Sequence, residues 1–222
     1  MRGNLESIAY DKIKVAISKG YIKKGSKLRE IALAKSLNMS RATVKGAVKR
    51  LVYEGLAKYE INKGVSVVNP SLEDIKDSFL VRIQLEKMAA RLAAKAMNNN
   101  DLDELNELVQ KEKDIFKARD LYQYYEINTV FHLRIAEKSN KKILVHYVKE
   151  LLQKTTIYLI LFDPFYQILE ESNSSPSEHL QIVQWLEKKD AENAANEIQL
   201  HLENTMANID MGSVLPQDYL EA

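Results

Sequence analysis

Hydrophobic residues in the first part of the chain recur three or four positions apart, which is the spacing of a helix with one buried face. The pattern predicts a helix over 5–19 that ends at Gly20, and a second, short helix over 29–36. The side chains expected to face inward are Leu5, Ile8, Ile13, Val15, Ile17, Ile31, Leu33 and Ala34.

A third helix is predicted over 41–54, and a hairpin is predicted after it. Ser40 precedes this helix and is a residue type that favours the N-cap position. The spacing then changes to alternation over 57–61 and 65–68, with Asn, Lys and Gly at 62–64 between them. This pattern indicates two antiparallel strands joined by a tight turn.

Beyond Pro70 the helical spacing continues, interrupted by polar breaks such as 98–101 and 172–177. No segment there has the alternation of a strand. The pattern predicts six helices and a tail after Met211 that frays. The predicted helices span about 72–97, 101–116, 119–138, 141–164, 177–188 and 190–209. The expected fold class is therefore mainly α.

Composition narrows the class of protein. The chain has 222 residues, of which 45% are hydrophobic and 28% are charged, as in globular proteins. No stretch approaches the ~18 apolar residues of a membrane span, and the N-terminal segment has no apolar signal core. The absence of cysteine excludes disulfide scaffolds, thiolate zinc sites and cysteine nucleophiles. We therefore expect a cytoplasmic protein that does not bind membranes.

The net charge of +1 hides two parts of opposite sign. Residues 1–69 hold 15 Lys and Arg against 5 Asp and Glu, a net charge of +10. Residues 70–222 hold 17 against 26, a net charge of −9. We expect a basic domain over 1–69, an acidic domain over 70–215 and a tail over 216–222. Such a basic domain attracts nucleic acid, but a basic face that only meets solvent has the same charge.

The order of predicted elements in the basic domain, three helices and then a two-stranded wing, is that of a winged helix-turn-helix. In this motif the N-terminal residues of the third helix meet bases and phosphates. Arg41 can bind guanine through two hydrogen bonds. Gly64 serves either a close approach to DNA or a turn that needs positive φ. The candidate DNA contacts are Arg29, Ser40, Arg41, Thr43, Lys45, Lys49, Lys63 and Gly64.

The run KLREIALAKSLNMSRATVKGAVKRLVYEGLAKYEINKGVSVV resembles the DNA-binding domain of the GntR superfamily of transcription regulators. The segments VRIQLEKMAARLAAKA, FHLRIAEKSN and SEHLQIVQWLEKKDAENAANEIQLHL resemble the all-helical ligand domain, or FCD domain, of its FadR branch. The resemblance implies a winged helix-turn-helix followed by a bundle of about six helices that senses a small molecule and dimerises. Ile31 and Lys45 depart from the family pattern, which often has arginine at both positions.

The histidines of the acidic domain are candidates for a metal site or for structural roles. Asn128 and His132 lie four residues apart and so share one face of a predicted helix. His179 and His201 fall in two later helices. Three imidazoles and one oxygen would suit Zn²⁺ or Ni²⁺. From spacing alone, scattered surface or core histidines are the stronger interpretation.

The resemblance reverses this balance. Metal-binding members of the FadR branch combine an Asp-x3-His pair with two later histidines, and these positions match Asn128, His132, His179 and His201 here. His146 falls outside the pattern and is interpreted as structural. Because Asn128 replaces a carboxylate by a neutral amide, we expect a divalent metal to be held more weakly than with aspartate.

The resemblance also implies an effector beside the metal, and a carboxylate is expected because it can complete the coordination sphere. Arg82 stands where the family often has an arginine that faces the cavity, and an ion pair with Glu86 is the alternative. Arg134 and Tyr158 are weaker candidates for effector binding. A core or a dimer interface is the commoner role for the aromatic residues Tyr122, Tyr124, Tyr125 and Phe131.

These observations lead to one main hypothesis and two alternatives. The main hypothesis is a transcription regulator, a repressor that binds a palindromic operator as a homodimer and responds to a small carboxylate. The first alternative is a metal-dependent, hydrolase-like enzyme with a basic appendage, although no general base stands beside the histidines in sequence. The second is an architectural protein that binds any DNA duplex.

Overall fold

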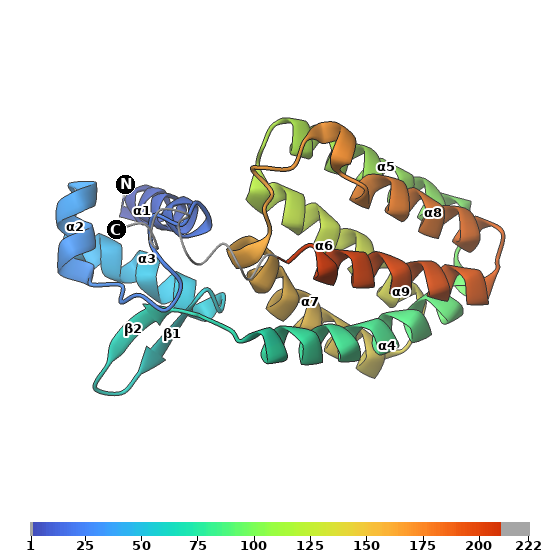
Figure 1. The fold of residues 1–222 in the computed structure, drawn as a ribbon, viewed down its shortest axis with the longest axis horizontal. Helices are drawn as coiled ribbons and strands as arrows, with labels where there is room; N and C mark the ends of the chain where they lie inside the picture. Colours follow the sequence, from blue (N-terminus) through green and yellow to red (C-terminus); the bar gives the residue numbers. More distant parts are fainter. Residues whose placement is uncertain (1, 210–222) are drawn as a thin grey trace, which may run out of the picture. The chain divides into compact units, whose positions relative to one another are not determined.

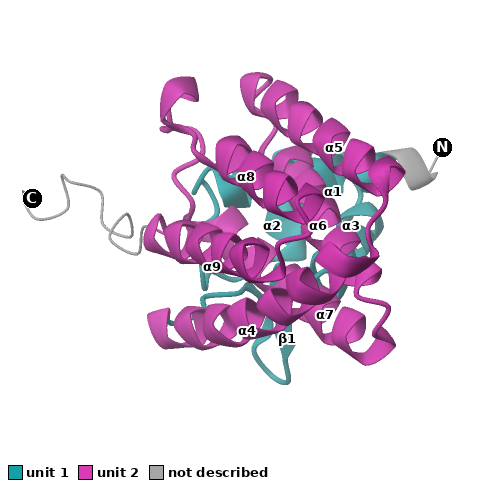
Figure 2. Cartoon of the chain, turned by 90° about the vertical axis from the view of Figure 1, so that its right-hand side faces the viewer, with its two compact units in different colours: residues 1–71 teal, residues 72–222 magenta. Residues whose placement is uncertain are grey.

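The computed structural model describes residues 2–209, with side chains described from residue 5 onward. The chain divides into two compact units, residues 1–71 and residues 72–222 (Figure 2). The expected domain end at 215, the tail over 216–222 and the fraying expected after Met211 all lie outside the described residues.

The first unit is a winged helix-turn-helix, as predicted. Its strands pair antiparallel, with Ala57 opposite Val67 and Glu60 opposite Gly64. Each predicted boundary lies within three residues of the observed one, because the helical and alternating patterns are both strong here. The elements are α1 (Arg2–Ser18), α2 (Glu30–Leu37), α3 (Arg41–Tyr53), β1 (Ala57–Glu60) and β2 (Gly64–Val67) (Figure 1).

The buried face of α1 differs from the predicted one. Leu5, Ile8 and Val15 are exposed. Their places in the core are taken by Ala9 and Tyr10, which lie on the same stripe as Ile13 and Ile17. Positions four residues apart share a helix face, and 9, 13 and 17 form such a series, whereas 8 and 15 lie about 140° and 200° around the helix from 13. The prediction counted large hydrophobic residues and overlooked Ala9.

The short helix α2 also departs from expectation, because none of its residues is fully buried. Ile31, predicted to face inward, is 70% exposed. Eight residues make only two turns, so α2 presents Leu33 and Ala34 partly to the core and leaves Ile31 in solvent. Ile31 therefore occupies a surface position, which is the kind of position that an arginine can use for DNA.

The second unit is an all-helical bundle whose six main helices lie within two residues of their predicted bounds. One short 3-10 turn, η1 (Glu170–Ser172), interrupts the long loop before α8. Among the described residues, no helix is long and apolar enough to cross a membrane. The helices are α4 (Leu72–Ala96), α5 (Asn99–Lys117), α6 (Leu121–Lys138), α7 (Lys142–Phe162), α8 (Ser175–Glu187) and α9 (Ala191–Ala207).

Helix α4 forms the base of the bundle and packs against α9, α7 and α6, while α8 packs against α5 and α9 (Figure 1). Small residues allow α4 and α9 to approach closely along their length. Both helices carry fully or almost fully buried alanines: Ala90, Ala93 and Ala94 on α4, and Ala194 and Ala195 on α9. This arrangement brings the inner faces of α4, α6, α8 and α9 together, and the last three of these helices carry the buried histidines.

Candidate metal centre, ligand cavity and DNA-reading surface

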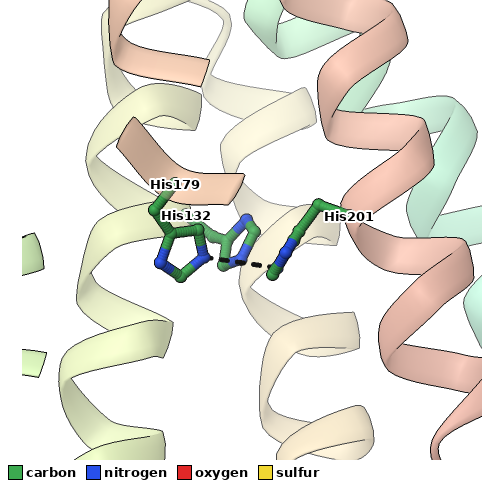
Figure 3. Close-up of side chains that lie close together, drawn as sticks. All are labelled: His132, His179 and His201. Carbon is green, nitrogen blue, oxygen red and sulfur yellow. Dashed lines mark hydrogen bonds between the residues drawn. The ribbon is translucent and has the colours of Figure 1, made fainter. Parts of the chain in front are cut away.

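Three histidines from three helices meet inside the bundle. His132 comes from the middle of α6, His179 from the second turn of α8, and His201 from α9 (Figure 3). All three are buried, and candidate ligand nitrogens, one from each ring, lie within 4.8 Å of one another. The Nε2 atoms of His179 and His201 are 3.2 Å apart. The structure thus brings together three of the four positions that the sequence proposed as metal ligands.

Each of these rings is held from behind by a glutamate. The contact is made by Nδ1 in every case, so Nδ1 donates to the carboxylate and the Nε2 lone pair is left for the centre. This polarised arrangement is the usual support for metal-binding histidines. The pairs are Glu86 with His132 at 2.6 Å, Glu112 with His179 at 2.7 Å and Glu178 with His201 at 2.7 Å.

The electrostatics of the centre keep His132 and His201 neutral. Burial lowers the pKa of His132 to about 3, against the opposing effect of Glu86. Burial also lowers the pKa of His201. Burial alone would raise the pKa of Glu86, but the charge of Arg82 and the hydrogen bonds from His132 and Arg82 hold it below its usual range. His132 and His201 are therefore neutral, and the carboxylate behind His132 is ionised.

The chemistry of this donor set fits a divalent cation. The buried Nε2 of His132 has no hydrogen-bond partner among the described residues, and a metal would satisfy it. Asn128 lies one turn before His132 on α6 and lines the cavity beside the centre. His146 lies elsewhere, on an exposed part of α7, where its ring contacts Tyr147.

A cavity adjoins the histidine centre within the second unit. His201 and Asn128 line it, together with Arg82, Asp163 and the polar loop over 172–175. The cavity volume is about 60 Å³, which is room for a few water molecules or a small polar group. The cavity therefore places a small, partly open polar space directly beside the candidate metal centre.

Arg82 combines the two roles that the sequence had left open. Its Nε donates to Glu86 Oε1 at 2.6 Å, and its Nη1 donates to Thr155 Oγ1 at 2.9 Å. The remaining nitrogen, Nη2, is buried and has no partner among the described residues. The guanidinium is thus fixed on one side by an ion pair and keeps one donor group unused.

The other two candidate effector residues do not line the cavity. Arg134 lies two positions after His132, about 200° around α6, and so points outward. It pairs on the surface with Glu104 and Glu137, each at 2.8 Å. Tyr158 is buried in α7, but its neighbour Leu159 is the residue that reaches the cavity. Both residues therefore lie on helix faces that point away from this cavity.

Aromatic residues form one wall of the cavity, as well as part of the core. Tyr124 and Tyr125 line it beside Phe116 and Phe165, with ring centroids between 5.1 and 6.4 Å apart. Phe131 instead stacks on the ring of His179 at 4.2 Å. The expected core role holds for these residues, but two of the tyrosines also face the ligand space.

Asp163 is a cavity residue that the sequence interpretation missed, because it was considered only as the end of a helix. Burial raises the pKa of Asp163 to about 6, against hydrogen bonds from the Tyr125 side chain and the Phe165 backbone. Its Oδ1 atom is buried and has no hydrogen-bond partner among the described residues. An aspartate directly before Pro164 at a helix end was the one signal present in the sequence.

The proposed DNA-reading residues of α3 lie on its accessible face, while its other face is core. Ser40 caps the helix by accepting a hydrogen bond from the Thr43 backbone at 3.1 Å. Arg41 follows with a side chain that is 69% exposed, and its Nε donates to Glu30 Oε2 at 3.2 Å. Exposed as well are Arg29, Lys45 and Lys49.

The wing presents Lys63 next to its tight turn. Gly64 has φ of 81°, and a Cβ atom there would meet nothing within 4 Å. Within this chain, the turn conformation and not a close contact is therefore what calls for glycine. Lys63 and Lys58 both bind the carboxylate of Glu60, at 2.8 and 2.7 Å. These two lysines lower the pKa of Glu60 to about 2, so it remains ionised at neutral pH.

Two family models match the chain. The model described as "Bacterial regulatory proteins, gntR family" matches residues 5–67, and the model described as "FCD domain" matches residues 77–204. The chain belongs to the GntR family. This result confirms the resemblance found in the sequence. As a GntR regulator with an FCD domain, the protein is a DNA-binding transcription regulator with an effector-binding domain, and it is not an enzyme.

Sequence alignments with known transcription regulators span most of the chain. YdhC of Bacillus subtilis (strain 168), an uncharacterized HTH-type transcriptional regulator, is 26% identical over 196 residues, which cover 86% of this chain and 85% of YdhC. A probable D-xylose utilization operon transcriptional repressor of Paenarthrobacter nicotinovorans is 27% identical over 142 residues, 63% of this chain and 62% of the repressor.

The solved structure of McbR/YncC from E. coli has a similar fold. It aligns with a TM-score of 0.66 at 25% identity and covers 91% of this chain and 95% of that one. McbR is also described as an HTH-type transcriptional regulator. The shared fold extends over both units of this GntR regulator, so the reader and the ligand-sensing bundle belong to one architecture.

Proposed function

We propose that this GntR regulator is a cytoplasmic, homodimeric repressor that releases a palindromic operator when a small carboxylate binds beside a divalent cation. The observation that carries the proposal is the convergence of three buried imidazoles, each backed by a glutamate, next to a cavity that contains a partly unpaired arginine. The related protein of Paenarthrobacter nicotinovorans is likewise described as a probable transcriptional repressor.

The donor set supports Zn²⁺ or Ni²⁺ as the cation. Three neutral imidazoles are typical ligands for both ions, and the Asn128 amide oxygen is the candidate for a fourth position. Asparagine brings no negative charge, which weakens the attraction for a cation. The three glutamates behind the rings compensate for this missing charge in part. Each places a negative charge directly behind one imidazole, although not in contact with the cation itself.

A carboxylate is the effector class that these groups favour. One oxygen of the carboxylate would complete the coordination of the cation. The unpaired Nη2 of Arg82 provides a donor for the other oxygen, and the guanidinium is already oriented by Glu86 and Thr155. A pre-oriented donor in a buried site loses little entropy when the ligand binds.

An apolar stripe on the bundle supports a homodimer. On α4, Leu80, Val81 and Met88 are exposed, with Leu80 61% exposed. On the neighbouring helix α7, Ile143 and Tyr147 are exposed as well. A second copy that covers this surface would place two reader units on one operator, since a single recognition helix contacts too few bases for specificity.

Control of DNA binding would follow from a population shift. An effector that binds one arrangement of the dimer more tightly than another favours that arrangement. If the favoured arrangement no longer matches the spacing of the operator half-sites, affinity for the operator falls. All six main helices of the bundle line the cavity, so a bound ligand contacts α4 and α7, which carry the apolar stripe.

Elemental mass spectrometry on untagged protein tests the metal centre, with His179→Ala as the site variant and His146→Ala as the matched control. We expect close to one equivalent of Zn or Ni in the wild type and in the control, and almost none in His179→Ala. Equal metal content in all three proteins, or none after supplementation with either ion, would contradict the centre. Footprinting on the regulator's own promoter region would separately test specific operator binding.

A further inference from the structure

Two buried polar atoms of opposite character lie in residues that line the same cavity. Nη2 of Arg82 is a donor without an acceptor, and Oδ1 of Asp163 is an acceptor without a donor, within the part of the chain that the structure describes. Buried polar atoms in proteins are nearly always paired, so an unpaired atom calls for an explanation. Two such atoms around one ligand space suggest that a ligand supplies the missing partners.

Asp163 is an unfavourable residue in the absence of a ligand. It is the C-cap residue of α7, where the negative end of the helix dipole disfavours a carboxylate. It is also largely removed from water, and the side chain of Tyr125 and the backbone of Phe165 are its hydrogen-bond donors. Neither donor reaches Oδ1. A buried acceptor left unpaired at a ligand cavity is typical of a residue retained for binding.

Arg82 and Asp163 lie at different heights along the axis of α7. Arg82 is tied to Thr155 on α7, and Asp163 follows eight residues later on the same helix. Eight residues correspond to about 12 Å along a helix axis. A ligand that satisfies both groups therefore needs an acceptor at one end and a donor at the other.

We propose that Asp163 determines effector specificity by accepting a hydrogen bond from a hydroxyl or ammonium group on the end of the effector opposite its carboxylate. This inference rests on the proposed function, in which Arg82 and the metal centre hold that carboxylate. The ligand class is then a hydroxy- or amino-substituted carboxylate. Dicarboxylates are disfavoured, because a second carboxylate would face Asp163.

Asp163→Asn separates this role from a structural one. An asparagine oxygen can still accept from Tyr125 and Phe165, while its NH2 group replaces Oδ1 and presents a donor to the cavity. The preference for ligands should therefore invert toward dicarboxylates. The melting temperature without ligand should rise by about 2–4 °C, because a buried charge is removed. If the carboxylate were needed for folding, the melting temperature would fall instead.

The test uses full-length, metal-loaded protein and four matched series of probes, each with three to six carbons. The series are simple monocarboxylates, ω-hydroxy acids, ω-amino acids and dicarboxylates, with affinities measured by isothermal titration calorimetry. For the wild type, we expect the best ω-hydroxy or ω-amino acid to bind about ten-fold more tightly than the monocarboxylate of equal length. Asp163→Asn and a second variant, Asp163→Ser, should lose this preference and keep the affinity for monocarboxylates.

The controls distinguish failure of this inference from failure of the proposed function. Asp103→Asn, on the exposed side of α5, should bind every probe as the wild type does. If monocarboxylates bind but the wild type shows no preference for a donor group, or if Asp163→Asn keeps that preference, the role of Asp163 is wrong and the carboxylate site stands. If no probe of any series binds the wild type, the carboxylate site fails and this inference fails with it.

Discussion

Arg41 and Glu30 connect the first turns of α3 and α2, with Arg41 Nε donating to Glu30 Oε2 at 3.2 Å. The arginine is largely exposed, and the glutamate is considerably less so. An exposed ion pair of this kind contributes little to stability. Its consequence is orientation, because it holds the guanidinium at the N-terminal end of the recognition helix with Nη1 and Nη2 available to bases.

Replacement of Arg41 by alanine should therefore weaken binding to the operator by about 1–3 kcal/mol, the usual effect of losing a bidentate contact to guanine. Binding to a random duplex should change much less. Fluorescence anisotropy with both duplexes at one salt concentration measures the two effects. Arg91→Ala, which removes an exposed arginine paired with Glu192 on the bundle, is the control. Equal losses on both duplexes would mean that Arg41 contacts only phosphate.

Glu60→Gln should strengthen binding to DNA of any sequence. Glu60 stays ionised at neutral pH and neutralises part of the charge of Lys58 and Lys63 on the wing. Without it, both lysines are free to displace counterions from phosphate, so the salt dependence of binding should become steeper by about one unit of log–log slope. Titration of a random duplex at several salt concentrations measures this slope.

The matched control for the wing is Glu107→Gln, which removes an exposed glutamate paired with Lys111 on α5. We expect its affinity and salt slope to equal those of the wild type. If Glu60→Gln also left both quantities unchanged, the wing would not approach DNA. Lys63 would then be a partner of Glu60 and have no further role.

Much of this architecture could be predicted because helical periodicity and turn residues are local signals. The bounds of α3 to α9 and the grouping of His132, His179 and His201 followed from them and from the family resemblance. Contacts between distant segments could not be predicted in this way. Glu112 stands 67 positions from His179 and looks in sequence like any other charged residue on an amphipathic helix.

Helix phase and the path of one loop explain the remaining differences between the predicted and the observed site. Arg134 and Tyr158 lie close in sequence to cavity residues but on other faces of α6 and α7. Asp163 belongs to the cavity because the loop after α7 folds back, bringing Phe165 and Asn173 to Tyr124. A loop of this kind has no periodic pattern, so its path cannot be derived from spacing.

Glu112→Gln should reduce metal affinity without removing a metal ligand. Glu112 accepts from His179 Nδ1 at 2.7 Å and from Ser175 at 2.8 Å. Glutamine can keep this geometry, but it lacks the negative charge that makes the imidazole a stronger electron-pair donor to the metal. We expect about ten-fold weaker binding of Zn²⁺, the lower end of the effect usual for such support residues. Competition with a chromophoric chelator measures it, and Glu104→Gln on the surface is the control; equal affinities would contradict the support role.

Asn128→Asp should have the opposite effect. The substitution adds a negative charge at the candidate fourth ligand, one turn before His132, with almost no change in shape. The affinity for Zn²⁺ should rise by at least about ten-fold, since a carboxylate binds the ion directly. The same chelator competition measures the change, with Asn140→Asp, at the exposed end of the α6–α7 turn, as control. A weaker or unchanged affinity would mean that residue 128 does not coordinate the metal.

Leu80→Asp should disrupt the homodimer. Leu80 is the most exposed of the large hydrophobic residues on α4, and Val81 and Met88 extend the same surface. If a second copy covers this stripe, the substitution buries an unpaired carboxylate in the interface, and the dimer dissociation constant should rise by about two orders of magnitude. Sedimentation equilibrium measures this dissociation constant.

The control is Leu169→Asp, on the exposed loop after α7, which should leave the dimer intact. A Leu80→Asp protein that remains dimeric would place the interface elsewhere. One that becomes monomeric should also lose operator specificity, since each monomer reads only a half-site.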